Sequence, residues 1–568
     1  MAHVDRTIEH KDTRTAGDEG RLRPRFPRAL HFSSQLPVWA WCGMLFVVAL
    51  VLNIYRLGQP SIWFDEAFSV ELARQPLPLL WHIIFGPEPN MELYYLLLHF
   101  WLQLTGALGL LPVEWVVRLP SAFCAALSTV VVFWLGRRYL GRGAGCVAAL
   151  LYALNYLQLV YAQQTRSYAL QLLLLCLSWL ALLAACCPDS VSGQCKRWWM
   201  LYVLSMTLAV YAHYFSILVL LAQVVALLGL CLLPGRWQSQ IRKQFFPWLV
   251  SLVVIGILII PMVIESQQGA KTGWLPVPHL GDLWALFQAI SGDNVRYLLV
   301  VGFAMLVGLV LASVGLLVRK NKGIQQQERA SGNHMRWLHA RARVMAAADY
   351  VPLAWMLLCW LVVPVVVSYI VSQGTLRLFS TRYLVVVVPA LCLLAALGVA
   401  ILRWLPGRVL LSLLLLGSAA LVTPHYYQNA QVEDWRASVF WLQEHYQTGD
   451  GLVCYDNEMN QGCQIAIEYY LHAYPSDVHF TSDTPGLFSW EKFGPANEQS
   501  GFLTALDPHS LADFASHHAH IFMILGRIPD AHGAIRAQQT VQWLDKHDHL
   551  SAQLHTATVT VLLYTTGV

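Results

Sequence analysis

Long apolar segments recur along the chain, each close to the length that crosses a lipid bilayer. A transmembrane helix needs about 20 apolar residues. Eleven segments approach or reach this length, and we predict membrane spans over residues 38–56, 114–136, 143–161, 168–187, 199–212, 215–233, 246–263, 297–318, 351–372, 382–402 and 409–423. The predicted fold class is an α-helical polytopic membrane protein, with a polar cytoplasmic segment at 1–37 and a transmembrane module at 38–423.

The segment 91–106 is also apolar, but it is short and contains Glu92, His99 and Gln103. We expect it to form a helix lying at the membrane face. A twelfth span there would place Arg137, Arg138 and the basic residues of 319–349 outside, against the positive-inside rule. With eleven spans and a cytoplasmic N-terminus, 24 of the 37 Lys and Arg residues fall in cytoplasmic segments, 8 in outer loops and 5 after residue 423.

Composition narrows the class of protein further. Hydrophobic residues make up 57% of the chain and charged residues 12%, whereas soluble domains carry about 45–50% and about 25%. A soluble enzyme is excluded, and the predicted location is the plasma membrane. The net charge of +4 is small and its cations are scattered, so we predict no nucleic-acid partner.

Residues 424–568 lack any run of spanning length and carry 5 basic against 16 acidic residues. After an odd number of spans they are predicted to lie outside. Strand-like runs are interleaved with helical patterns, which indicates a small extracytoplasmic α/β domain. The expected strands are 451–455, 478–481, 520–525 and 556–564, and the expected helices are 434–447 and 535–550.

Two features of this C-terminal part leave alternatives open. Cys454 and Cys463 form a disulfide if the domain is extracytoplasmic, or they are two free thiols. His517, His518 and His520 hint at a metal, but no acid–His spacing supports a site. A solvated loop is the better interpretation of these histidines.

The first outer loop, residues 57–113, is long and carries candidate chemistry. Asp65 and Glu66 stand between aromatic residues soon after the first span. A carboxylate at a membrane face is costly unless it meets a cation, a metal or a substrate. The alternative is an interfacial carboxylate that simply faces water.

Further polar residues are predicted on the same face. Arg377 and Arg382 lie at a loop-to-helix junction, and guanidinium groups suit phosphate oxygens, although such residues also anchor helices at the interface. His213 has the competing interpretation of a buried, satisfied histidine. Carboxylates, arginines and aromatic rings beside an apolar bundle favour a substrate with a lipid tail, a phosphate and a polar head, such as a sugar linked to a polyprenyl phosphate.

At these residues the sequence resembles a known family. Asp65-Glu66 is followed by Leu-Tyr-Tyr-Leu-Leu-Leu at 93–98, and Arg382-Tyr-Leu comes later. Between them stand Arg-Leu-Pro-Ser at 118–121, Gly-Arg-Arg at 136–138 and Arg-Ser-Tyr-Ala-Leu at 166–170. This order is similar to the polytopic glycosyltransferases with the GT-C fold. More closely, residues 38–423 resemble the bacterial branch of the protein mannosyltransferase and aminoarabinose transferase superfamily.

The resemblance implies a polyprenyl-phosphate sugar donor, transfer on the outer face and inversion at the anomeric carbon. Asp65 matches the family's catalytic Asp, and Glu66 its neighbour. The family's His-Pro-Pro or Lys-Pro-Pro is replaced by Glu-Pro-Asn at 88–90, which shifts the phosphate contact toward Arg377, Arg382 and Lys271. The expected substrate-binding residues are Glu88, Tyr94, Gln163, Arg166, Tyr168 and His213.

In the expected mechanism, the Asp65 carboxylate takes the proton of an acceptor hydroxyl, and arginines hold the leaving phosphate. The acceptor is a glycan, a lipid or a protein; the sequence does not decide. The sequence does not decide whether a metal cofactor is needed, and two alternatives remain for the phosphate: arginines alone, or a divalent cation on Asp65, Glu66 and Glu88. A polyprenyl-linked glycan polymerase or ligase stays as an alternative function. A transporter is less favoured, because no internal repeat is evident.

Overall fold

The structure is a computed structural model that describes residues 36–88, 90–186, 192–232, 236–266, 272, 275–321, 347–455, 462–496, 506–526, 528 and 531–567. The chain divides into a small unit, Met1–Gly43, and a large unit, Met44–Val568. All the contacts discussed below lie within the large unit.

Each of the eleven predicted spans falls on helical structure. The helices are α1 (Val38–Ile54), α5 (Glu114–Leu140), α6 (Arg142–Ala153) with α7 (Tyr156–Ala162), α8 (Tyr168–Cys186), α9 (Ser192–Ala212), α10 (Ser216–Leu232), α12 (Phe245–Ser266), α14 (Val295–Asn321), α16 (Val351–Val371), α17 (Val388–Ile401) and α18 (Leu405–Gln428). Among the described residues, seven helices are long and apolar enough to cross a membrane. The number rises to nine if two bent pairs, α6 with α7 and α10 with α11 (Arg236–Lys243), each count as one span. The count of eleven is not confirmed.

The bend of 61° between α6 and α7 has a local cause. Asn155 caps α7, and its side chain accepts the backbone N–H of Gln158 at 3.2 Å. A new helix therefore begins where a straight span would have continued. The break brings the end of α7 and the following loop, residues 163–167, into the neighbourhood of the first outer loop.

Shorter helices occupy the loops. The first outer loop contains α2 (Phe64–Arg74), α3 (Leu77–Ile84) and α4 (Glu92–Ala107); later come α13 (Leu280–Ser291) and the 3-10 helices η1 (Ala348–Tyr350) and η2 (Tyr383–Val387). The helix predicted at 91–106 is confirmed as α4, and its position at the membrane face stays a prediction.

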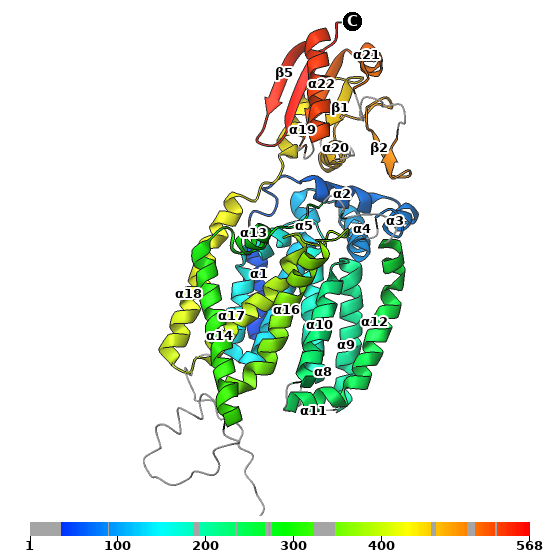
Figure 1. Cartoon of the computed structure of the whole chain (residues 1–568). Helices are drawn as coiled ribbons and strands as arrows, with labels where there is room; N and C mark the ends of the chain where they lie inside the picture. Colours follow the sequence, from blue (N-terminus) through cyan, green and yellow to red (C-terminus); the bar gives the residue numbers. More distant parts are fainter. Residues whose placement is uncertain are drawn as a thin grey trace, which may run out of the picture. The chain divides into compact units, whose positions relative to one another are not determined.

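Helix α17 lies at the centre of the bundle. All of its residues are buried, and it packs against α5, α6, α14 and α16 (Figure 1). Glycines allow the closest of these approaches: a Cβ atom on Gly308 of α14 would lie 2.9 Å from the backbone nitrogen of Gly398 of α17. The apolar side chains of this helix therefore serve helix packing.

The C-terminal part contains a four-stranded sheet of order β1-β4-β6-β5. Strands β1 (Gly451–Tyr455) and β4 (His520–Leu525) are parallel, whereas β6 (Thr560–Thr565) is antiparallel to β4 and to β5 (His549–His555). Helices α19 (Trp435–His445), α20 (Gly462–Ala473), α21 (Pro508–His517) and α22 (Ala531–His547) accompany it, with a small pair of strands, β2 (Phe488–Ser489) and β3 (Gly494–Pro495). The predicted α/β character is confirmed.

The structure confirms some of the helices and strands predicted for this domain and contradicts others. Strands β1 and β4 have the predicted bounds. The strand expected at 478–481 was wrong, because this short run has no partner strand. Strand β5 begins at His549, where the helix predicted over 535–550 was expected to continue.

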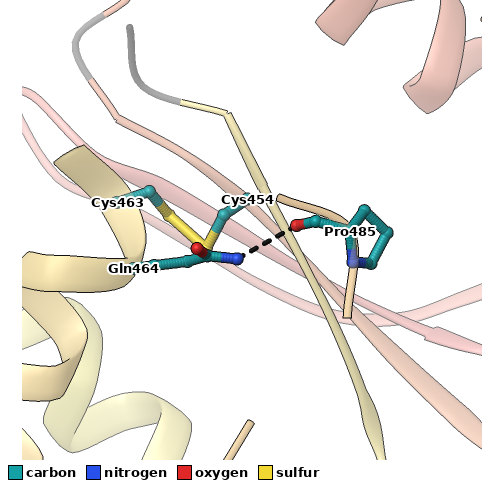
Figure 2. Close-up of a disulfide and its surroundings, with 4 residues drawn as sticks. All are labelled: Cys454, Cys463, Gln464 and Pro485. Carbon is teal, nitrogen blue, oxygen red and sulfur yellow. Dashed lines mark hydrogen bonds between the residues drawn. A yellow bond between two sulfur atoms is a disulfide. The ribbon is translucent and has the colours of Figure 1, made fainter. Parts of the chain in front are cut away.

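Cys454 and Cys463 are joined by a disulfide, which settles the pairing that the sequence left open. The bond connects the end of β1 to the first turn of α20 (Figure 2). Beside it, the Gln464 side chain donates to the carbonyl of Pro485 at 3.0 Å. The disulfide and this hydrogen bond fix α20 to the sheet and to the loop at 485.

Candidate active site

Asp65 lies in the first turn of α2, where a carboxylate suits the positive end of the helix dipole. Its Oδ2 atom is 3.1 Å from Nη1 of Arg382 and 3.6 Å from Nη2 of Arg166. The side chains of Asp65, Arg382 and Arg166 are 19%, 29% and 10% exposed. One carboxylate thus stands between two guanidinium groups, of which that of Arg382 is the more exposed.

Arg166 comes from the loop between α7 and α8. Its Nη1 donates to the backbone carbonyl of Asp65 and to Oγ of Ser69, both at 3.1 Å. Arg166 therefore holds the first turn of α2 as well as facing the Asp65 carboxylate.

Arg382 directly precedes η2, and its Cζ lies 5.9 Å from the ring centre of Trp63. Such a contact between a guanidinium and an indole face is favourable. Arg382 is thereby held between Trp63 and Asp65, two residues of the same outer loop.

Aromatic rings line the far side of the arginines. The ring of Tyr168 lies 4.4 Å from that of Tyr161 and 5.2 Å from that of His213. Tyr383 stacks on Phe215 at 4.0 Å and lies 5.4 Å from His213. Burial, together with Arg166 and Arg382, lowers the pKa of His213 to about 3, so this imidazole is neutral at physiological pH.

The Glu66 side chain forms a buried ion pair with Arg118. Both of its oxygens accept from Arg118, at 2.8 and 2.6 Å, and the backbone N–H of Thr165 donates to it at 2.7 Å. Arg118 also donates to the carbonyls of Leu57, Pro60 and Ser61. The pair is buried and ties α2, α5 and the preceding loop together.

The chain that follows α18 fastens the start of α2. Glu433 is buried, and its Oε2 accepts the backbone N–H of Phe64 at 2.9 Å and the indole N–H of Trp435 at 2.8 Å. The Gln431 side chain accepts the backbone N–H of Ser61 at 2.9 Å. Residues 431–435 thus fix the backbone on which Asp65 stands.

A second network joins the C-terminal domain to α5. The Glu114 carboxylate accepts from Arg436, at 2.6 Å, and from the hydroxyls of Tyr470 and Tyr474, at 3.0 and 2.9 Å. The Tyr470 hydroxyl also accepts the backbone N–H of Ile62 at 2.8 Å. The first outer loop is therefore held from the domain side at several points.

Two carboxylates follow α3. Glu92 is 1% exposed at the start of α4; burial, with a further contribution from the nearby Glu88, raises its pKa to about 8. Glu92 is therefore mostly protonated at neutral pH. Tyr94 is also buried, and its hydroxyl lies 3.4 Å from Oγ of Ser121 on α5.

The structure brings only part of the predicted set together. Asp65, Arg166, Arg382, Tyr168 and His213 gather at one place. The other predicted residues lie apart: Glu66 faces Arg118, Gln163 bonds to Asn53, Tyr55 and Tyr426, Arg377 donates to carbonyls at the end of α16, and Tyr94 faces α5, while Lys271 lies outside the described residues.

A divalent cation on Asp65, Glu66 and Glu88 was one of the two alternatives that the sequence left open. Glu66 is committed to Arg118 by two hydrogen bonds. Within the described ranges, no group of three or more His, Cys, Asp or Glu side chains has an arrangement that could hold a metal ion. His518, expected in a solvated loop, is instead buried between the Gly449 carbonyl and Asp483.

Sequence reasoning missed three residues of the site. Trp63 adjoins Arg382, Arg118 neutralises Glu66, and Glu433 fastens α2. A signal existed for Arg118, because a buried arginine within an apolar segment needs a carboxylate partner. Glu433 stands directly before the Asp-Trp-Arg run at 434–436, and only the fold reveals its partner.

The chain is similar to known proteins in part of its sequence and in its fold. Residues 95–264 match the sequence model of the dolichyl-phosphate-mannose-protein mannosyltransferase family. The helical bundle has the GT-C fold, and the segment 95–264 is similar to membrane glycosyltransferases of this fold. The expected resemblance is confirmed, and the chain is an integral membrane protein.

One solved structure supports the fold, and a second is similar at a lower score. The structure of ArnT from Cupriavidus metallidurans bound to undecaprenyl phosphate is 14% identical, with a TM-score of 0.50, and the match covers 92% of this chain and 98% of that one. The oligosaccharyltransferase of Archaeoglobus fulgidus is 13% identical over 93% of this chain and 74% of that one, with a TM-score of 0.46, too low to support an argument. A search of curated protein sequences finds no match.

Proposed function

We propose that this glycosyltransferase moves a sugar from a polyprenyl-phosphate donor to a hydroxyl acceptor on the extracytoplasmic face, with inversion at the anomeric carbon. The observation that carries the proposal is the position of the Asp65 carboxylate between Arg382 and Arg166, at 3.1 and 3.6 Å. Two guanidinium groups beside one carboxylate suit a lipid phosphate. The similar fold of ArnT, a protein seen with undecaprenyl phosphate, supports the same donor class.

The proposed step is a single displacement. The acceptor oxygen attacks the anomeric carbon, the bond from that carbon to the phosphate oxygen breaks, and the acceptor proton passes to the Asp65 carboxylate. The polyprenyl phosphate leaves with the electron pair. A general base typically contributes 10²–10⁴-fold to the rate, and guanidinium donors stabilise the charge that develops on the phosphate.

Arg382 is assigned to the phosphate, because it is the more exposed of the two guanidinium groups, at 29% against 10%. Arg166 holds α2 and shares the phosphate charge. Glu66 is assigned a positioning role, since both oxygens are occupied by Arg118. Tyr168 and His213 are buried, and they are assigned a packing role beside the two arginines.

The test is a lipid extract from a strain that lacks the gene, complemented with wild type, Asp65→Asn or Asp477→Asn. The deletion strain should accumulate a polyprenyl-phosphate sugar and lack a glycan. Asp65→Asn should fail to restore the glycan, whereas Asp477→Asn, at an exposed residue outside the site, should restore it. Transfer by Asp65→Asn above a tenth of wild type, with equal amounts of membrane-inserted protein, would remove Asp65 from the chemistry.

A further inference from the structure

Two adjoining cavities lie between the first outer loop, the end of α7 and the end of α18. Their volumes are about 180 and about 170 Å³, and both are lined by Pro60, Gln163 and Ala430. We call the pair the amide cleft, because side-chain amides dominate its polar lining. These amides belong to Gln59, Gln163, Gln164, Gln428, Asn429 and Gln431.

The charge of the amide cleft is nearly balanced. Among the described residues that line it, Glu66 alone is acidic, and it is neutralised by Arg118 at 2.6 Å. Arg56 donates to the side chain of Gln59. The guanidinium groups proposed to bind the donor phosphate, those of Arg382 and Arg166, do not line the cleft. The cleft therefore suits a neutral ligand.

Its chemistry matches a polyhydroxylated ligand. A side-chain amide both donates and accepts hydrogen bonds, as sugar hydroxyls require. Aromatic rings of Trp63, Tyr156, Tyr426 and Tyr427 complete the lining and offer apolar faces to sugar C–H groups. Amides and aromatic rings, with Arg56 as a cation beside them, form a lining that suits saccharide hydroxyls and C–H groups.

Some polar atoms of the lining side chains are already hydrogen-bonded within the protein, and others have no partner among the described residues. The Gln163 amide donates to the carbonyls of Asn53 and Tyr55 and accepts from the Tyr426 hydroxyl. These hydrogen bonds fix the side chain in place. In contrast, Oε1 of Gln164 and Nε1 of Trp63 are buried and have no hydrogen-bond partner among the described residues. Buried polar atoms are nearly always hydrogen-bonded, so this acceptor and this donor are unsatisfied polar atoms on side chains that line the cleft.

The amide cleft connects to the Asp65 site through Trp63. This indole lines the larger cavity, and its ring centre lies 5.9 Å from Cζ of Arg382, which pairs with Asp65. We infer that the cleft binds a neutral saccharide chain of a glycan acceptor, whose terminal hydroxyl extends past Trp63 to Asp65. This inference rests on the proposed function and names its acceptor class.

Saturation-transfer NMR on the full-length protein in nanodiscs tests the inference. The probes are maltotriose and triacetylchitotriose as neutral saccharides, trigalacturonate as an anionic one, and a serine-containing peptide. The wild type should transfer saturation to at least one neutral saccharide and to neither trigalacturonate nor the peptide. Gln164→Ala and Trp63→Phe should weaken that binding at least fivefold, while Gln553→Ala, at an exposed amide on β5, should not change it.

Several outcomes would overturn the inference. These are no neutral saccharide binding, binding that survives both cleft variants, or preferential binding of the peptide or of trigalacturonate. Undecaprenyl phosphate binding is measured on the same samples and should persist in Gln164→Ala. Failure of the wild type to bind undecaprenyl phosphate would count against the proposed donor. If the wild type binds undecaprenyl phosphate but no neutral saccharide, only the inference about the amide cleft is overturned.

Discussion

The Glu433 carboxylate accepts the backbone N–H of Phe64 at 2.9 Å, although the two residues lie far apart in the sequence. The bond fixes the first residue of the helix that carries Asp65. A carboxylate at that point also suits the positive end of the helix.

Glu433→Ala should lower kcat about tenfold and leave donor affinity nearly unchanged. The reason is that hydrogen bonds to charged groups contribute about 1.5–3 kcal/mol, and this one positions Asp65 without touching the donor. Glu433→Gln keeps an acceptor and should retain most of the activity. The measurement is steady-state transfer and donor binding, with Glu444→Ala, an exposed residue on α19, as the control. Equal loss of kcat and donor affinity would argue for general unfolding of the site.

Arg382→Lys should bind the donor about 10- to 100-fold more weakly, nearly as weakly as Arg382→Gln, because an ammonium cannot make the paired contacts of a guanidinium. Donor affinity and turnover in nanodiscs measure this. Arg377→Gln is the control, since Arg377 donates to carbonyls at the end of α16. Should the Lys variant equal wild type, Arg382 would be an interfacial anchor.

Glu66→Gln should destabilise the protein by about 3–5 kcal/mol, because it leaves Arg118 as an uncompensated buried charge. Replacing both partners with apolar residues, Glu66→Leu with Arg118→Met, should recover part of the loss. Thermal unfolding of the purified variants measures both effects. A Glu66→Gln variant with wild-type stability and no transfer would instead place Glu66 in the chemistry.

Glu468 makes the stability of the C-terminal domain depend on pH. Its carboxyl is partly buried on α20, and burial, with Glu71 nearby, raises its pKa to about 7 from about 4.5. The folded state therefore holds this proton more tightly than the unfolded state does. The resulting stabilisation is complete below pH 4.5 and is lost as the pH rises through 7.

A shift of this size corresponds to at most about 3 kcal/mol. Glu468→Gln should flatten this part of the stability profile and raise stability at pH 8. Thermal unfolding between pH 4.5 and 8 measures it, with Glu491→Gln, at an exposed residue, as the control. Parallel profiles for wild type and Glu468→Gln would contradict the assignment.

A reporter placed between Arg403 and Arg408 should read cytoplasmic, and one at the C-terminus extracytoplasmic. The charge asymmetry of the loops predicts this orientation, and the disulfide between Cys454 and Cys463 fits an oxidising compartment. A cytoplasmic C-terminus would reverse the side on which Asp65 acts.

The sequence predicted those features that a local pattern encodes. Apolar runs located the helices because lipid exposure and helix packing both demand them over about 20 residues. Asp65 and Arg382 could be named, but their contact across 317 positions came only from the fold. Glu66 was grouped with Asp65 because the two are adjacent, yet neighbours on a helix point in different directions, and only the fold shows that Glu66 faces Arg118.

Two other features were missed for different reasons. Glu433 stands in a connection between two helices, so nothing in its neighbourhood indicated a partner in the first outer loop. Strand β5 does alternate Leu550, Ala552 and Leu554 with polar residues, as a half-buried strand should. Its first residues were assigned instead to the helix predicted over 535–550, so the short alternating run that follows was overlooked.

The complete burial of α17 has a consequence for biogenesis. This helix is apolar enough to enter the bilayer on its own, yet in the finished protein its neighbours replace lipid on every side. It must therefore exchange lipid for protein contacts after insertion, and its close approach to α14 at Gly308 and Gly398 would be made only then. Substituting a larger residue at Gly398 should consequently leave membrane insertion intact and stall the chain at a later step, as an inserted but unassembled bundle open to membrane proteases.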